Sequence, residues 1–101
     1  MRDVTKTAVS RFVNYDRILL SAIDADGRHS YDGLSKLVMS QLGYAPVKNE
    51  AYVFLVRGKG QQERVKILTR TDQSTNIVEL RGEQAKPLIK VCLIIRKLNK
   101  K

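Results

Sequence analysis

The sequence has little of the chemistry on which many small proteins depend. It contains one cysteine, no tryptophan and two prolines in 101 residues. A single thiol cannot close an internal disulfide, so a disulfide-stapled secreted scaffold is excluded and a reducing compartment is predicted. The cysteine, Cys92, stands among aliphatic residues, which predicts a buried thiol that behaves as a small hydrophobic group.

Long apolar runs are also missing. No stretch approaches the roughly 18 apolar residues of a membrane-spanning helix, and residues 1–10 mix charged and small side chains where a secretion signal would be apolar. We therefore expect a cytoplasmic protein without a membrane segment. The 43% hydrophobic content supports one modest core, so we expect a single domain over residues 1–101, with its core at about 15–95 and a flexible basic tail at 96–101.

Acidic residues are scarce in the second half of the chain, and this asymmetry is the strongest compositional feature. The formal net charge is +9; residues 1–50 carry 7 basic against 6 acidic side chains, whereas residues 51–101 carry 12 against 4. The halves therefore contribute +1 and +8. Such a surface attracts nucleic acid or acidic partners, and the phosphate contribution would make DNA binding depend on salt. The alternative is a merely soluble surface.

The first half of the chain predicts one clear helix. Apolar residues recur at helical spacing over 30–42, with Ser30 as N-cap, and Gly43 ends the segment. The short apolar stretch 16–23 ends in turn-forming residues and predicts a strand. Residues 3–13 have weaker helical spacing, which permits a short N-terminal helix without favouring it.

Three strands are predicted in the second half. Residues 51–57, 64–70 and 75–81 are rich in β-branched and aromatic side chains, and the short polar stretches between them are typical of hairpin loops. The predicted fold is therefore α+β: a small antiparallel sheet, made of a meander over about 51–81 plus a strand near 16–23, packed against one main helix at about 30–42.

The segment 87–98 is ambiguous between two structures. Pro87 is typical of a helix start, whereas the run of β-branched residues that follows is typical of a strand. The β-branched run favours a strand at 90–95.

Catalytic and metal-binding signals are weak. His29 has no cysteine or acidic partner at ligand spacing, so a surface or capping role is favoured over zinc. Asp24, Asp26 and Asp32 are explained by turns and helix capping, because the distal glutamate of a calcium loop is missing. The Gly58-Lys59-Gly60 tip lacks the spacing of a phosphate-binding loop. We expect no enzymatic activity, no metal and no cofactor.

The basic residues of the second half are more orderly. Strand alternation places Arg64 and Lys66 on one face, and a ribbon of positive charge along a phosphate backbone is predicted from Arg57, Lys59, Arg64, Lys66 and Arg70. Protection of an exposed strand edge is the alternative explanation of these charges.

Tyr52 and Phe54 share the other conspicuous pattern, because they lie on one face of the strand at 51–57. They would stack on bases if they were exposed, but an aromatic pair in a central strand favours a place in the core.

The middle of the chain resembles a known family. A tetrad opens the helix, a Val-Phe pair lies in the first strand of the meander, and a basic glycine turn precedes a lysine-centred strand: Tyr31-Asp32-Gly33-Leu34, Val53-Phe54, Arg57-Gly58-Lys59 and Arg64-Val65-Lys66-Ile67-Leu68. In order and spacing these resemble the Orf2-like accessory protein, the second-open-reading-frame product, of insertion-sequence-66-type transposons, over roughly residues 17–81.

The resemblance implies a bacterial, non-catalytic accessory factor in DNA transposition that works beside a separate transposase. Together with the basic second half, it favours binding to DNA, to the transposase, or to both, with weak sequence preference. A protein-interaction adaptor without nucleic-acid contact is the alternative. A metal-dependent nuclease is disfavoured, because Glu63 with Lys66 is too small a basis for a metal site. The sequence leaves the oligomeric state open.

Overall fold

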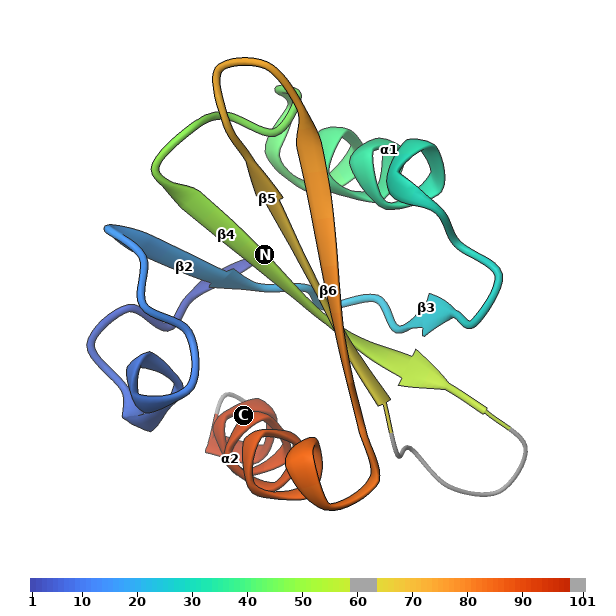
Figure 1. Ribbon diagram of the computed structural model, residues 1–101. Helices are drawn as coiled ribbons and strands as arrows, with labels where there is room; N and C mark the ends of the chain where they lie inside the picture. The colour runs from blue at the N-terminus through green and yellow to red at the C-terminus, as the bar shows by residue number, and fades with distance from the viewer. Residues whose placement is uncertain (59–63, 99–101) are drawn as a thin grey trace.

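The computed structural model, which describes residues 1–58 and 64–98, is a six-stranded sheet between two helices (Figure 1). The hydrogen-bonded order of the strands is β1-β2-β4-β5-β6, and β3 pairs with β4. The described elements, with two 3-10 turns named η, are β1 Arg2–Asp3, η1 Ala8–Arg11, β2 Arg17–Leu20, β3 Ala25–Asp26, α1 Tyr31–Leu42, β4 Glu50–Arg57, β5 Arg64–Arg70, β6 Thr75–Arg81, η2 Gly82–Gln84 and α2 Lys86–Leu98.

The predicted meander is present, since β4, β5 and β6 pair antiparallel in sequence order. The α+β class is confirmed, but the sheet that was expected to be antiparallel is mixed, because β2 runs parallel to β4. The reason is that α1 lies between these two strands and returns the chain to the same end of the sheet, as in a β-α-β crossover. The short β3 continues alongside β4 beyond the end of β2, pairing Ala25 with Val56.

Both faces of the sheet are covered, which explains the unbroken apolar run in β4. Tyr52 and Phe54 point to the face that α1 covers, and Val53 and Leu55 point to the face that α2 and η1 cover. All four side chains are fully buried, so the predicted core position of the two aromatic residues is confirmed. A strand buried on both faces has no polar alternation.

The C-terminal segment is a helix, so the strand predicted at 90–95 is wrong. Leu88, Ile89, Cys92 and Ile95 are its buried residues and recur at helical spacing. Packing of this stripe on the sheet outweighs the strand preference of the β-branched run. The helix also extends through Leu98 into the expected flexible tail, of which residues 99–101 lie outside the described range.

The segment 3–13, where the spacing permitted a short helix, contains the end of a strand and one 3-10 turn. The chain there forms β1, which pairs antiparallel with β2, and then the short turn η1. Thr7 caps this turn by accepting a hydrogen bond from the N–H of Val9 at 3.2 Å. Val4 and Val9 are fully buried, so the segment contributes side chains to the core without forming an α-helix.

Helix α1 matches the expectation closely. Its N-cap residue is Ser30, although the side chain makes no capping bond, and Gly43 ends it with a left-handed φ of 81°. The N–H of Gly43 donates to the carbonyl of Met39 at 2.8 Å, a bond that satisfies one of the last helical acceptors. Over residues 1–58 and 64–98, no helix combines the length and hydrophobicity needed to cross a membrane.

The thiol of Cys92 lies on the buried side of α2, within the core, as predicted. Burial raises its pKa to about 11, because a thiolate loses its hydration there. The protonated thiol therefore acts as a packing group.

Candidate nucleic-acid interface

Lys66 is buried, so its predicted exposure beside Arg64 is wrong. Only 6% of the residue is exposed. Its Nζ donates hydrogen bonds to the carbonyl oxygens of Gly27 at 2.9 Å and of His29 at 2.8 Å. The strand alternation was predicted correctly, but the segment before α1 covers the sheet face at this position. Lys66 therefore fastens that segment to the sheet.

Arg64 lies beside the same segment and remains one-third exposed. A Cβ atom at Gly27 would lie 2.4 Å from its Nη2, so the absence of a side chain there leaves space for the guanidinium. Glu79 of β6 forms ion pairs with two residues of β5. Its carboxylate oxygens lie 4.0 Å from Arg64 Nη1 and 4.0 Å from Lys66 Nζ. It also contacts Arg81 Nε.

Four arginines lie at one end of the sheet. This end contains the last residues of β4 and β6, the first residue of β5 and the loop after β3. We call them the basic end: Arg28, Arg57, Arg64 and Arg81. The side chains of Arg28 and Arg81 are 93% and 70% exposed. The cross-strand register explains part of the cluster, since Arg64 lies directly opposite Arg81.

The basic end keeps a positive excess after its ion pairs are counted. Asp26 pairs with Arg28 at 3.5 Å, and Glu79 pairs with three cations. The backbone N–H of Arg28, followed by its side chain, lowers the pKa of Asp26. Among the described residues of this region, four guanidiniums and the buried Lys66 ammonium thus meet two carboxylates, a formal excess of three positive charges.

An open cleft of about 550 Å³ borders the basic end and is lined by Ala22, Ile23, Asp24, Asp26, Arg57 and Arg96. Arg96 of α2 is fixed on its wall, with Nη1 2.8 Å from Asp24 Oδ1 and Nη2 donating to the carbonyl of Ser21 at 2.9 Å. The charge of Arg96 is thereby largely balanced by Asp24. Arg57 has an exposed side chain at this cleft.

The predicted ribbon of five cations is therefore divided. Arg57 and Arg64 belong to the basic end, Lys66 is buried, and Lys59 lies outside the described residues. Arg70 stands at the opposite end of β5, about 20 Å from Arg64 at the usual rise of a strand, where it shares a shallow groove with Tyr31. The exposed arginines of the predicted ribbon therefore lie on two separate surfaces.

Arg28 and Arg81 were not among the residues predicted to bind DNA. The signal for Arg81 was present in the meander: a tight turn at 71–74 pairs Arg70 with Thr75 and hence Arg64 with Arg81. Arg28 carried no such signal, because its place depends on how the loop before α1 folds over the sheet.

The family tetrad lies where this loop enters α1. Leu34 is fully buried and Tyr31 is 52% exposed, while Asp32 is exposed in the first turn. A Cβ at Gly33 would lie 2.7 Å from the His29 ring, so the absence of a side chain at Gly33 leaves space for the imidazole. His29 Nδ1 in turn accepts the N–H of Asp26 at 2.7 Å. Gly33 and Leu34 therefore have structural roles, whereas the side chains of Tyr31 and Asp32 are exposed.

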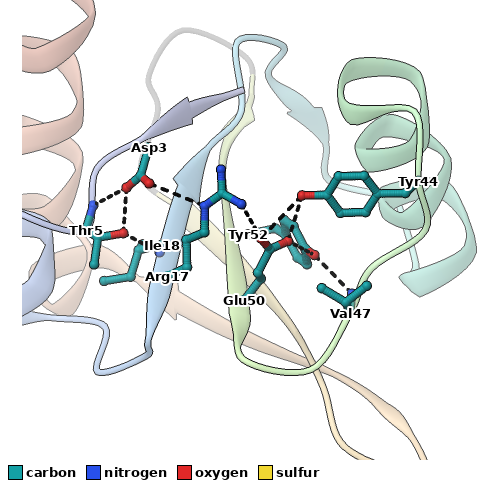
Figure 2. A network of polar contacts seen from close by, with 8 residues as sticks. All are labelled: Asp3, Thr5, Arg17, Ile18, Tyr44, Val47, Glu50 and Tyr52. Carbon is teal, nitrogen blue, oxygen red and sulfur yellow. Dashed lines mark hydrogen bonds and ion pairs between the residues drawn. The ribbon is translucent and has the colours of Figure 1, made fainter.

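A second polar cluster lies around Glu50, at the start of β4 (Figure 2). The carboxylate is buried and accepts hydrogen bonds from the hydroxyls of Tyr52 at 2.6 Å and Tyr44 at 3.0 Å. Arg17 Nη1 donates to it at 2.8 Å and Arg17 Nε reaches Asp3 at 3.3 Å. The cluster thus links β1, β2, β4 and the loop after α1.

The pKa shifts in this cluster indicate that its side chains stabilise the fold. Burial, followed by the bond to Glu50, raises the pKa values of Tyr52 and Tyr44, so both hydroxyls stay protonated as donors. The hydroxyl of Thr5 lowers the pKa of Asp3. Since Glu50 already accepts three side-chain donors, it is not placed as a free general base. In the described part of the chain, no group of three or more metal-ligating side chains comes together.

The chain matches a known protein family. The family model described as IS66 Orf2 like protein matches residues 16–86, which is 71 of the 101 residues. The match begins before β2, includes every strand from β2 to β6 and stops at the start of α2. No curated protein and no solved structure matches the chain.

Proposed function

Because the chain belongs to the IS66 Orf2-like family, we propose that it is a non-catalytic accessory factor in transposition of an insertion sequence, and that its basic end binds DNA. The family name associates the chain with insertion sequences; contact with DNA or with the transposase is the proposal. The accessory role would be carried out in the cytoplasm.

The observation that carries the proposal is the gathering of four arginines at one end of the sheet. Guanidinium groups bind phosphate oxygens through paired N–H donors, and they lose less on desolvation than lysine ammoniums. The exposed Arg28 and Arg81 would meet phosphates first. Arg64, which forms a 4.0 Å ion pair with Glu79, is the less exposed contact.

The same geometry favours weak sequence preference. The cations of the basic end come from strand ends and from one loop, positions that suit contacts to the phosphate backbone. Base reading requires side chains that enter a groove and match donor and acceptor patterns. We expect the DNA site to be selected by the transposase or by the arrangement of several copies of this chain.

A non-catalytic role agrees with the state of the acidic residues at the basic end. Asp26 and Glu79 are both ion-paired with arginines, so neither is placed to take a proton from a reacting group. The alternative function is an adaptor whose basic end meets an acidic protein surface. Binding to such a protein at physiological salt, without binding to DNA, would favour it.

A salt titration of the wild-type protein tests DNA binding. A labelled duplex carrying the transposon end and a scrambled duplex are titrated by fluorescence anisotropy at several salt concentrations. We expect micromolar binding to both, with a log–log salt slope of about −3 to −4, as about four phosphate contacts would give. Absence of binding at low salt would reject the proposal in favour of the adaptor.

A further inference from the structure

Strand β6 leaves one edge of the sheet open. It pairs with β5 along all seven of its residues, and no described segment pairs with its other side. In Figure 1 the strand crosses the front of the sheet between the two helices, which cover the faces of the sheet. The opposite edge strand, β1, has only two residues.

The hairpin turn shows which backbone groups of β6 point away from β5. The N–H of Thr71 donates to the carbonyl of Ser74 at 2.8 Å, which makes these two residues a hydrogen-bonded pair. Because such pairs alternate along an antiparallel ladder, the next ones include Val78 with Ile67. The backbone groups that point outward are then those of Thr75, Ile77, Glu79 and Arg81.

The usual protection of an edge strand is weak here. The strand contains no proline, lysine or glycine, residues that commonly prevent edge pairing. Its acidic side chain, Glu79, forms ion pairs with Arg64 and Lys66 of β5 and with Arg81 of β6 itself. In the middle of the strand, Val78 leaves 50% of its surface exposed. The edge is therefore long, regular and apolar at its centre.

We propose that a second copy of this chain pairs antiparallel along β6, with Val78 opposite Val78 of the second copy. This register brings all outward-facing groups together, since Thr75 pairs with Arg81 and Ile77 with Glu79. No like charges lie directly opposite each other. The two valines occupy a position without direct hydrogen bonds, where opposing side chains approach most closely. The strand is thus complementary to itself.

The pairing would arrange two proteins around a two-fold axis perpendicular to the sheet. Both α1 helices then lie on one face of the joined sheet and both α2 helices on the other. The basic ends point in opposite directions, because the paired strands are antiparallel. If the proposed function is correct, one dimer would hold two separate DNA segments.

Electrostatic repulsion opposes this association. Each copy carries a formal charge of +9, so added salt should strengthen the dimer by screening, whereas salt weakens DNA binding. The two proposals therefore respond to salt in opposite directions and can fail independently.

Analytical ultracentrifugation without DNA tests the dimer. The wild-type protein should shift with concentration from 11.5 kDa toward twice that mass, and more so at higher salt. Val78→Lys places two ammoniums opposite each other, and we expect at least about 10-fold weaker association. Val47→Lys is the matched control, because Val47 is also a half-exposed valine, at 42%, outside β6.

A mixing experiment distinguishes the register from a general effect of charge. Val78→Glu should also weaken self-association, whereas an equimolar mixture of the Lys and Glu variants should restore it, since opposite charges then face each other. Circular dichroism verifies that each variant is folded. The proposal is overturned if the wild type stays monomeric at every concentration and salt, if Val78→Lys associates like the Val47→Lys control, or if mixing restores nothing.

Discussion

Replacing Arg57, Arg64 and Arg81 together with alanine is expected to weaken DNA binding by about 100-fold at low salt and to flatten the log–log salt slope by about 2 to 3. The physical reason is the release of counterions: each lost phosphate contact removes about 0.9 from the slope. All three side chains lie at the ends of adjacent strands, so one DNA backbone can meet them together. Fluorescence anisotropy with the same duplex measures both quantities.

A variant with the same loss of charge elsewhere provides the control. Lys36, Lys48 and Arg70 are exposed side chains away from the basic end. Their joint replacement by alanine lowers the net charge by the same three units, and we expect only about a 3-fold loss from weaker long-range attraction. An equal loss in the two triple variants would show that net charge, and not the basic end, determines binding.

Lys66→Met is expected to lower the free energy of unfolding by about 2 to 3 kcal/mol, although methionine has a similar length and suits a core. The ammonium satisfies two carbonyl oxygens, those of Gly27 and His29, and the thioether cannot donate to them. Urea denaturation measures the loss. Faster exchange of the amide hydrogens of residues 26–29 would locate it in the segment before α1.

Arg64→Met is the matched control, since it changes a cation on the same strand face that remains partly exposed. We expect about 1 kcal/mol or less from this change, because exposed ion pairs contribute little to stability. If Lys66→Met proved as stable as the wild type while DNA binding fell sharply, Lys66 would be a DNA contact and its structural role would be wrong.

The sequence predicted the parts of the fold that depend on local patterns. Helix α1 has a regular apolar stripe and a glycine stop, and the meander has three β-rich segments joined by short polar loops. Tyr52 and Phe54 were assigned to the core because a central strand seldom exposes aromatic side chains. In each case neighbouring residues alone carried the signal.

The parts that failed depend on contacts between distant segments. The β-branched run in α2 has a strand preference that packing against β4 and β5 overrides. The parallel pairing of β2 was not considered, because the sequence does not show which strands will be neighbours. Lys66 alternates with apolar residues like an exposed cation, and only the covering loop reveals that it is buried.

In the candidate site, too, local patterns were predictable and contacts between distant segments were not. Arg57 and Arg64 were recognised from their places in the meander, whereas Arg70 was grouped with them although it lies at the other end of β5. Arg28 joins the basic end only through the loop that Lys66 fastens to the sheet. Charge along the sequence therefore predicted a cationic surface, and the register of the strands determined which charges share it.

Chemical-shift mapping of the isotope-labelled wild-type protein with a short DNA duplex shows which residues DNA contacts. We expect that, among residues 1–58 and 64–98, the largest amide shifts occur at Arg28, Arg57, Arg64 and Arg81 and at their neighbours. The α1 surface around Lys36 and the turn after Arg70 should change little. Shifts concentrated at that opposite end, or none at DNA concentrations well above micromolar, would show that the basic end does not bind DNA.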